Sequence, residues 1–333
     1  MSTIGVLGAG TWGVALARML SNCGHEVTVW SRNEAEIRRM ETTRRHKNLP
    51  DTVIPETTAF TTNMETACRD KEIVLFAVPS KGVRMTARAA APYITEEQIL
   101  VDVAKGLEPD TLLTMSQVIR AELAAAGKPG VRIVALSGPT HAEEVALDLP
   151  TTIISACDDP AAAETVQDVF MNSCMRVYTN RDVEGVELCG AVKNIIALAA
   201  GISAGLGFGD NAKAAIITRG MAEIKRLGLA MGCFEDTFAG LAGIGDLIVT
   251  ATSRHSRNNR CGFLIGQGMK PADAVEQIGM VVEGINALPA ATQLAEKYGV
   301  EMPIVQAVDR VVNRGADPRA EVVALMARDK KAE

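Results

Sequence analysis

TIGVLGAGTWG, residues 3–13 of this 333-residue chain, sets the architecture of its first half. An apolar run ends at Leu7, a glycine-rich turn follows, and residues 14–20, VALARML, have a helical pattern. A second apolar run, EVTVW at residues 26–30, completes the unit. The order strand, glycine turn, helix and strand within about 30 residues is typical of a parallel βαβ unit.

The glycines of this turn, Gly8, Gly10 and Gly13, suit a specific ligand. They permit a tight turn, let the backbone approach a pyrophosphate and bring the helix against the strand, while the helix N-terminus offers free amides to phosphates. A tight turn without any ligand is the alternative. The complete unit around the turn favours a dinucleotide-binding site.

The end of the second strand bears on which dinucleotide binds. An NAD-selective site usually has Asp or Glu there, to hold the ribose 2′-hydroxyl. This chain has Ser31-Arg32-Asn33 instead. A guanidinium can bind a 2′-phosphate, and the missing carboxylate removes the repulsion that would reject it. We therefore predict that NADP is accepted as well as NAD, the alternative being that Arg32 is an ordinary surface residue.

Further apolar strand patterns alternate with helical stretches through the first half. The predicted strands are 72–78, 99–103, 131–136 and 151–155, the predicted helices include 111–126 and one from Asp159 to Phe170, and 37–63 is predicted as a helix end and a long loop. This alternation indicates an α/β fold with a doubly wound parallel sheet. After Asp182 the pattern is helical, for example over 211–229, and 328–333 is predicted as a frayed end. We expect a dinucleotide-binding domain at 1–181 and a helical substrate-binding domain at 182–333.

Composition and charge narrow the range of functions. The net charge of −6 argues against a general binder of nucleic acid or anionic membranes, so small molecules are the expected partners. Seven scattered cysteines without a CxxC pair, and four histidines without metal-type spacing, indicate neither a disulfide framework nor a metal site. The N-terminus shows no leader-like pattern, and we expect a cytoplasmic protein.

Residues 188–209, LCGAVKNIIALAAGISAGLGFG, contain Lys193 as their only charged residue. The run is long enough to suggest a membrane span, but a lysine at bilayer depth costs about 2.5–3.5 kcal/mol. We interpret the run as a helix buried in the protein. Loss of water would favour the neutral amine of Lys193, which could then exchange protons near neutral pH. Alternatively, the lysine stem lies along apolar surface and its ammonium reaches the helix end.

Polar residues follow two of the predicted strands, where ligands bind in such sheets. Lys105 follows strand 99–103, and Gly138 and Thr140 follow strand 131–136. A lysine there could polarise a carbonyl or hold an anion, and the other two could present amides and a hydroxyl. A solvated lysine and an ordinary turn are the alternatives.

The helical half contains further candidates. The glycine-dense stretch 240–247 presents Asp246, either as a helix N-cap or as a ligand of substrate hydroxyls or of Lys193. Residues 256–258, Ser-Arg-Asn, precede an apolar run, and an arginine with hydroxyl and amide donors at a helix start suits a phosphate monoester. A solvated basic loop is the alternative. Glu283 follows another apolar run, and spacing alone leaves its role open.

Together these segments resemble the bacterial-type NAD(P)-dependent glycerol-3-phosphate dehydrogenases over nearly the whole chain. The motifs occur in the family's order: GVLGAGTWG, AVPS, KGLE, LSGPTHAEEVA, GVELCGAVKNIIALAAGISAGLGFGDNAKAA, TFAGLAGIGDL and SRNNRCGFLIGQG. The resemblance implies a Rossmann-type domain followed by an all-α domain like the C-terminal domain of 6-phosphogluconate dehydrogenase. It also implies an oxidoreductase that interconverts sn-glycerol 3-phosphate and dihydroxyacetone phosphate with NAD or NADP, chiefly for phospholipid biosynthesis.

Carried over motif by motif, the resemblance makes Lys193 the general acid/base. The implied substrate contacts are Lys105, Gly138, Thr140, Lys193, Asp246, Ser256, Arg257 and Asn258. The implied cofactor contacts are Gly8, Gly10, Thr11, Trp12, Gly13, Arg32, Lys105, Ala142, Arg257, Val281 and Glu283. No metal, nucleic-acid partner or membrane-embedded segment is implied, and a homodimer is one expectation. The chain departs from the family pattern at Thr140, His141 and Asn259, where serine, phenylalanine and arginine are commoner.

Two other hypotheses remain open from the sequence. One is a related two-domain dehydrogenase, of the β-hydroxyacid or ketopantoate type, but a carboxylate substrate does not call for the phosphate-binding cluster at 256–258. The other is a catalytically silent NADPH-binding sensor. Retention of both Lys105 and Lys193 argues against it, because a sensor needs no proton donor.

Overall fold

The computed structural model describes residues 1–330, so residues 331–333 of the predicted frayed end lie outside the described part. The chain forms two compact units. Unit 1 comprises Met1–Lys105 and Leu113–Glu187, and unit 2 comprises Gly106–Leu112 and Leu188–Glu333. The short segment Gly106–Leu112 therefore leaves the first unit and packs with the second, where Leu107 is part of the apolar core.

Unit 1 contains a single sheet with the strand order β3-β2-β1-β4-β5-β6-β7-β8. Its strands are β1 Thr3–Leu7, β2 Glu26–Trp30, β3 Ala59–Thr61, β4 Ile73–Phe76, β5 Ile99–Asp102, β6 Arg132–Ser137, β7 Thr151–Ala156 and β8 Met175–Asn180. Neighbouring strands pair parallel except β6 and β7, which pair antiparallel with Ala135 opposite Ala156. The Rossmann-type parallel sheet is confirmed, and the prediction of β7 as a further parallel strand is wrong.

Two strands of the sheet were not predicted. β3 lies in the segment that we expected to be a loop, and it pairs with only three residues of β2. β8 has exposed side chains at alternate positions and is the last strand in the sheet order. Both occupy an edge of the sheet, where an apolar run is not needed because one side of the strand is open to solvent.

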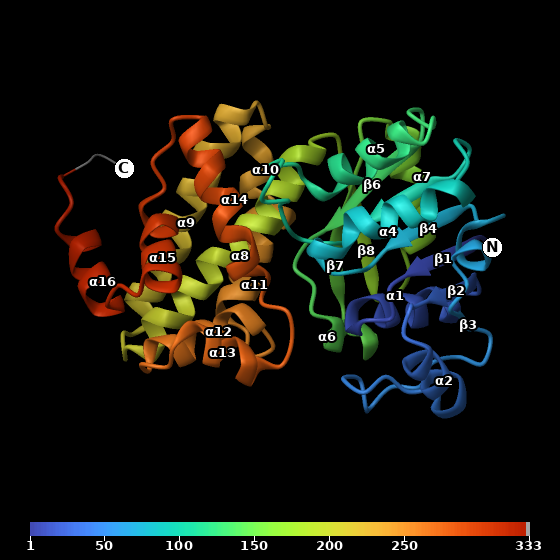
Figure 1. Ribbon diagram of the computed structural model, residues 1–333, viewed down its shortest axis with the longest axis horizontal. Coiled ribbons are helices and arrows are strands. Elements are labelled where there is room, and N and C mark those ends of the chain that lie inside the picture. Colours follow the sequence, from blue (N-terminus) through green and yellow to red (C-terminus); the bar gives the residue numbers. More distant parts are fainter. Residues whose placement is uncertain (331–333) are drawn as a thin grey trace. The chain divides into compact units, whose positions relative to one another are not determined.

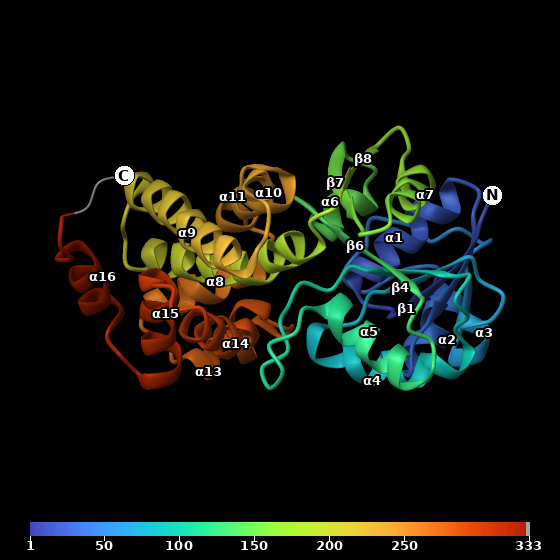
Figure 2. The same ribbon diagram turned by 90° about the horizontal axis from the view of Figure 1, so that it is seen from above.

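Helices cover both faces of the sheet. The helices of unit 1 are α1 Thr11–Asn22, α2 Glu34–Thr43, α3 Met64–Cys68, α4 Val83–Ala90, α5 Met115–Ala125, α6 Ala142–Ala146 and α7 Pro160–Phe170, with 3₁₀ turns η1 Ser80–Gly82 and η2 Ala91–Tyr93. Alternate residues of β4 enter different cores: Ile73 and Leu75 pack with α1 and α7, and Val74 and Phe76 pack with α4 and α5. Figure 2 shows these two pairs of helices on opposite sides of the strands.

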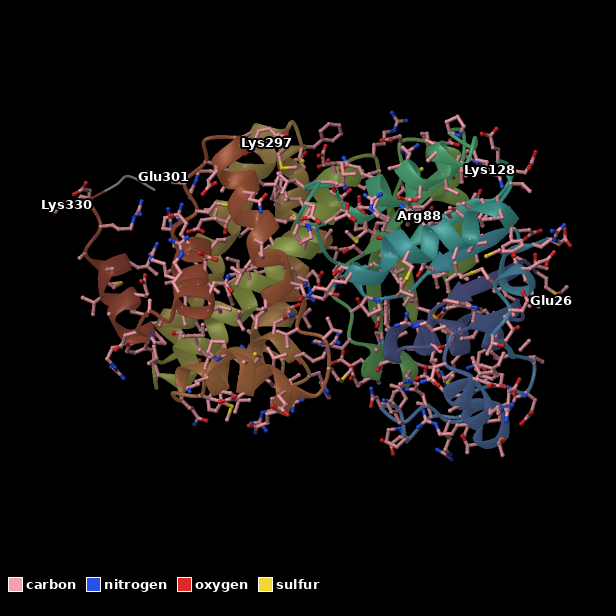
Figure 3. The ribbon with its side chains drawn as sticks, viewed as in Figure 1. Glu26, Arg88, Lys128, Lys297, Glu301 and Lys330 are labelled. Atoms are coloured by element: carbon pink, nitrogen blue, oxygen red, sulfur yellow. The ribbon has the colours of Figure 1, made fainter. Side chains whose placement is uncertain are left out.

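Side chains fix two of the helix positions in unit 1. Asp159 accepts a hydrogen bond from the Ala161 amide and caps α7, as the sequence predicted. On the other face, Arg88 of α4 donates to Glu122 of α5 over 2.8 Å, and Figure 3 labels Arg88 on this surface. Helix α5 begins later than predicted, because residues 106–112 pack with unit 2.

The regular elements of unit 2 among its described residues are helices, and its segment Gly106–Leu112 is not helical. Its helices are α8 Val183–Gly205, whose first residues belong to unit 1, α9 Asp210–Met231, α10 Glu235–Ala239, α11 Asp246–Thr252, α12 Arg257–Gly266, α13 Pro271–Ile278, α14 Glu283–Lys297, α15 Pro303–Arg314 and α16 Pro318–Met326, with a π-helical turn, η3, at Leu241–Gly245. The predicted all-α architecture of the second half is confirmed. Figure 1 shows α8 among the other helices of this unit.

Helix α8 is the centre of the core of unit 2. It is the one described helix that is long and apolar enough to cross a membrane, but 89% of its most apolar window is buried inside the protein. Leu188, Ile195 and Leu198 have no exposed surface. The interpretation of this run as a buried helix agrees with that packing, and burial of apolar area supplies the main stabilisation.

Gly5, in the middle of β1, provides a test of the packing in unit 1. A Cβ at this position would lie 1.8 Å from the carbonyl oxygen of Ala67, which is backbone and cannot rotate away. We expect Gly5→Ala to cost about 3 kcal/mol or more and to lower the melting temperature by roughly 6–12 °C. Gly10→Ala is the matched control, because a Cβ at Gly10 meets nothing within 4 Å. Equal melting temperatures for the two variants would contradict the packing described here.

Candidate functional site

The glycine-rich turn between β1 and α1 has the geometry that a phosphate-binding turn requires. Gly8 has φ +127°, and a Cβ there would lie 2.6 Å from the Ala77 carbonyl oxygen. A Cβ at Gly13 would lie 2.2 Å from the Gly8 carbonyl oxygen, so strand and helix are in direct backbone contact. At Gly10, the N-cap of α1, the surrounding space is open. A glycine cap supplies no side-chain acceptor, which leaves the first amides of α1 for an anion.

Two residues of the segment predicted as a loop lie against this turn. The Asn48 amide nitrogen donates to the Thr11 hydroxyl over 2.9 Å. His46 is 2% exposed, and its Nδ1 accepts a hydrogen bond from the backbone amide of Asn48, whereas the bond to Thr11 comes from the Asn48 side chain. His46 is also hydrogen-bonded to the backbone of Ala9. Burial, with the charges of Arg39 and Lys47, lowers the pKa of His46 to about 4. The imidazole is therefore neutral at neutral pH and helps to hold the turn.

Arg32 follows β2 and is exposed. Its neighbour Ser31 is buried, donates to the Glu36 carboxylate and accepts from the Asn33 amide. Glu36, the carboxylate near the end of β2, is thus bonded to Ser31, and the guanidinium of Arg32 is left at the surface. This arrangement fits the predicted role of Arg32 towards a 2′-phosphate.

Lys105, Gly138 and Thr140 lie together at the carboxyl ends of β5 and β6. The ammonium of Lys105 donates to the Gly138 carbonyl over 2.9 Å, and the Thr140 hydroxyl donates to the same carbonyl over 3.1 Å. Gly138 has φ +158°, which favours glycine. The hydroxyl of Ser137 next to it is buried and has no partner among the described residues. A polar ligand at this edge could satisfy that hydroxyl.

Lys193 forms a buried ion pair in unit 2. Its Nζ lies 2.5 Å from Oδ1 of Asp246 and also donates to the Thr250 hydroxyl. The exposed fractions of the Lys193 and Asp246 residues are 4% and 0%. Of the alternatives for Asp246, the structure supports a ligand of Lys193, because the N-cap position of α11 is Gly245. Thr250 was not predicted; it lies one helical turn after Asp246.

The π-helical turn Leu241–Gly245 brings Asp246 to the lysine. Gly243 departs from helical geometry within it, with φ −87° and ψ −105°. A Cβ at Gly243 would lie 2.2 Å from the Phe238 carbonyl oxygen. The glycine-dense stretch thus allows a backbone contact that presents a buried carboxylate at the start of α11.

Residues Ser256, Arg257 and Asn258 form the start of α12, as predicted. Ser256 is the N-cap and accepts from the Asn259 amide at 3.2 Å. Arg257 is partly exposed, whereas Asn258 is buried and accepts from the Gly284 amide at 2.8 Å. An arginine beside a helix N-terminus has the donors and the charge to bind a phosphate.

The remaining predicted cofactor contacts lie at element ends. Ala142 is the first residue of α6, and Trp12 lies in the first turn of α1 and packs on the core of unit 1. Val281, with 37% exposure, precedes α14, and Glu283 is its first residue. Their roles stay predictions, as do those of the other site residues.

The residues predicted from motifs therefore form clusters within each unit. Unit 1 contains two of these clusters. One is the glycine-rich turn, and the other joins Lys105 to Gly138 and Thr140. Unit 2 pairs Lys193 with Asp246, and joins Asn258 to the start of α14. The sequence signal missed Asn48, His46 and Thr250, because single polar residues in a loop or a helix carry no recognisable pattern.

The residues of unit 1 fit a dinucleotide. The uncapped amides of α1 would bind a pyrophosphate, for which the open space at Gly10 leaves room. The surface guanidinium of Arg32 would bind a ribose phosphate. The hydroxyl of Ser137, which has no partner among the described residues, would bind a polar group. In unit 2 the ion pair and the start of α12 suit a small anion with an exchangeable proton.

Comparison with known proteins gives a consistent result over nearly the whole chain. Residues 3–163 match the N-terminal family and residues 182–323 the C-terminal family of the NAD-dependent glycerol-3-phosphate dehydrogenases. A protein of Lactobacillus delbrueckii subsp. bulgaricus called glycerol-3-phosphate dehydrogenase [NAD(P)+] 2 is 66% identical, over 100% of this chain and 99% of its own length. A relative from Bacillus subtilis is 49% identical, over 99% and 95%. The crystal structure of glycerol-3-phosphate dehydrogenase from Coxiella burnetii has 35% identity and a TM-score of 0.93, over 98% of this chain and 99% of that one.

The lowered pKa of His46 predicts acid sensitivity of unit 1. Because the folded-state pKa lies below the usual 6.5, the unfolded chain binds a proton that the folded chain does not, and stability falls as pH falls from 6.5 towards 4. The free energy of unfolding of the wild type should fall between pH 7.5 and pH 5. We expect this fall to be smaller by about 1 kcal/mol in His46→Gln, allowing for solvent screening. Urea unfolding of both proteins at the two pH values measures it. The same pH dependence in both would show that His46 is not buried in its neutral form.

Proposed function

The chain belongs to the NAD-dependent glycerol-3-phosphate dehydrogenase family, and from this premise we propose that it interconverts sn-glycerol 3-phosphate and dihydroxyacetone phosphate with NAD(H) or NADP(H). The observation that carries the proposal is the buried ion pair of Lys193 with Asp246, on the same unit as the phosphate-type cluster Ser256–Asn258. A proton donor and a site for a phosphate are the two groups that this substrate needs from the protein.

Lys193 acts as the general acid/base at the C2 oxygen of the substrate. When the ketone is reduced, its ammonium gives a proton to the developing alkoxide oxygen; when the alcohol is oxidised, the amine takes the hydroxyl proton. Asp246 and Thr250 hold Nζ in place, and the Asp246 carboxylate balances its positive charge, so the charged donor is tolerated in a water-poor site. A nicotinamide cofactor, when bound, would supply or accept the hydride at C2.

The substrate phosphate binds at the start of α12, where Arg257 offers a forked guanidinium and Ser256 and Asn258 offer polar groups. Lys105, Gly138 and Thr140 of unit 1 complete the proposed substrate contacts, with Lys105 as a second cation for the alkoxide. The cofactor contacts are those assigned from the family motifs. The glycine-rich turn and the first amides of α1 hold the pyrophosphate, and Arg32 holds a 2′-phosphate.

We further propose that residues 1–181 act as the dinucleotide-binding domain and residues 182–333 as the substrate-binding domain. The matched family segments, 3–163 and 182–323, support this division. A role in phospholipid biosynthesis, a cytoplasmic location and a homodimer stay predictions. Gel filtration with light scattering tests the homodimer directly.

The activity is tested by steady-state oxidation of NADPH and of NADH by the purified protein. We expect turnover with dihydroxyacetone phosphate and at least about 100-fold lower kcat/KM with unphosphorylated dihydroxyacetone or a 2-keto acid, because the phosphate contacts supply binding energy that the other ketones cannot use. Preference for the keto acid would refute the proposed substrate and indicate the reaction of a related two-domain dehydrogenase. Tight NADPH binding without any turnover would indicate a sensor.

Replacing the lysine tests the mechanism. We expect Lys193→Ala to lower kcat by at least about 10³-fold, because the alkoxide loses its proton donor, and to leave NADPH affinity nearly unchanged. Lys213→Ala is the matched control, since Lys213 forms only an exposed pair with Asp210. Turnover within tenfold of the wild type for Lys193→Ala would exclude the lysine from the chemistry.

Arg32→Ala tests the coenzyme site. The loss of a charge-assisted contact to the 2′-phosphate should raise KM for NADPH about 10-fold or more and leave KM for NADH within about twofold. Arg38→Ala, on the exposed face of α2, is the control, because Arg38 pairs with Glu34 at the surface. Equal losses with both coenzymes would refute the role of Arg32.

A further inference from the structure

Asn194 follows the lysine on α8, and the reaction described so far does not use it. The residue is 5% exposed, and both ends of its amide group are engaged. Its Nδ2 donates to the Gly190 carbonyl over 3.0 Å, within the helix, and its Oδ1 accepts from Nδ2 of Asn258 at 2.9 Å. A buried amide pair is costly unless it is satisfied, so this contact fixes both side chains.

Asn258 extends the connection to a third helix. Its Oδ1 accepts from the Gly284 amide at 2.8 Å, beside Glu283 at the start of α14. The backbones are close here, because a Cβ on Gly284 would lie 2.5 Å from the Asn194 carbonyl oxygen. Two side-chain amides therefore join α8 to the starts of α12 and α14.

The same two helices, α8 and α12, are in backbone contact further along. A Cβ on Gly262 would lie 2.1 Å from the Leu198 carbonyl oxygen, and a Cβ on Gly266 would lie 2.2 Å from the Ile202 carbonyl oxygen. These pairs have the sequence separation of 64 that also separates Asn194 and Asn258. The two helices thus run parallel in one register over two turns.

Glycines of α8 lie equally close to backbone carbonyls of α12. A Cβ on Gly201 would lie 2.1 Å from the Asn259 carbonyl oxygen, and a Cβ on Gly205 would lie 2.2 Å from the Phe263 carbonyl oxygen. Backbones this close cannot slide past each other without clashes. The register of α12 on α8 is therefore determined by packing, and the amide pair Asn194–Asn258 lies at the end of the contact that carries Lys193.

We propose that Asn194 is a positioning residue: acting through Asn258, it sets the phosphate-binding start of α12 against the proton donor Lys193. The proposal rests on the function proposed above for Lys193 and for Ser256–Asn258. Without the Asn194 oxygen, the Asn258 amide loses a partner and can rotate away from the Gly284 amide. The first turn of α12, with Arg257, is then no longer held at one distance from Lys193.

The test compares a phosphorylated with an unphosphorylated substrate. Asn194→Leu keeps the size of the side chain and removes both polar atoms. We expect kcat/KM for dihydroxyacetone phosphate to fall about 10- to 100-fold, as for the loss of a hydrogen bond that leaves a buried partner unsatisfied. For unphosphorylated dihydroxyacetone, which makes no use of the start of α12, we expect a fall of less than about threefold. A purely structural role would lower both values equally.

Two reference variants make the outcome decisive. Val311→Ala, in the buried face of α15, reports how a loss of stability in unit 2 affects both substrates. Arg257→Ala reports the phosphate site itself and should discriminate between the substrates at least as strongly as Asn194→Leu. Suppose that Arg257→Ala lowers kcat/KM selectively for the phosphorylated substrate. If Asn194→Leu then lowers kcat/KM equally for both substrates, or for neither, the positioning role alone is overturned. No discrimination by Arg257→Ala would refute the phosphate site and the proposal with it.

Gly201→Ala provides an independent approach that leaves every polar group in place. Its Cβ should push α12 away from α8 at the Asn259 carbonyl and give the same selective loss with the phosphorylated substrate. If Asn194→Leu does not fold, Asn194→Ala and Gly201→Ala are judged by the same ratio of the two kcat/KM values. A ratio equal to that of the wild type in both would overturn the proposal.

Discussion

The ion pair of Lys193 and Asp246 is the interaction on which the chemistry proposed for the helical unit depends. An isolated ammonium in the apolar helix α8 would be costly, and a removed partner would leave the other charge buried and uncompensated. The ammonium of Lys193 donates hydrogen bonds to the Asp246 carboxylate at the start of α11 and to the Thr250 hydroxyl one turn further along. Asp246 directly follows the π-helical turn, and its Oδ1 lies 2.5 Å from Nζ of Lys193. A buried charge of this kind adds little net stability, which is why a functional role is the better explanation for it.

Close backbone contact is the second constraint, and both units use it. In unit 1 the glycine-rich turn brings α1 against β1, with Gly13 touching the Gly8 carbonyl. In unit 2 the glycines of α8 and α12 bring two helices into contact in one register. In unit 1 the contact lies beside the N-terminus of α1, whose first amides have no side-chain cap, whereas at the start of α12 Ser256 caps the Asn259 amide. Both units thus use glycines to bring backbone segments into contact, and the phosphate sites proposed beside these contacts stay predictions.

The sequence predicted the features that have a strong local pattern. Strands β1, β2, β4, β5 and β6 are apolar and flanked by turns, and the apolar run around Lys193, with a lysine that disfavours a membrane span, predicts a buried helix. It did not predict β3 and β8, because edge strands lack a continuous apolar run, nor the antiparallel pairing of β7, because a strand pattern contains no direction. Thr250, His46 and Asn194 make contacts with residues distant in sequence, which no local pattern contains. Asp246 was predicted only in part. The glycine-dense motif before it indicated a site residue, but the sequence left open whether it caps a helix or binds substrate hydroxyls or Lys193.

The shared register of α8 and α12 limits how this chain can change in length. One residue inserted between Lys193 and Gly201 would rotate the lysine by about 100° around the axis of α8, away from Asp246, while the glycines stayed against α12. The same applies between Arg257 and Gly262. Insertions and deletions in these two intervals should therefore be absent from active descendants of this sequence. In these intervals both the spacing and the glycines themselves are constrained, because a Cβ on Gly201 or Gly262 would meet backbone.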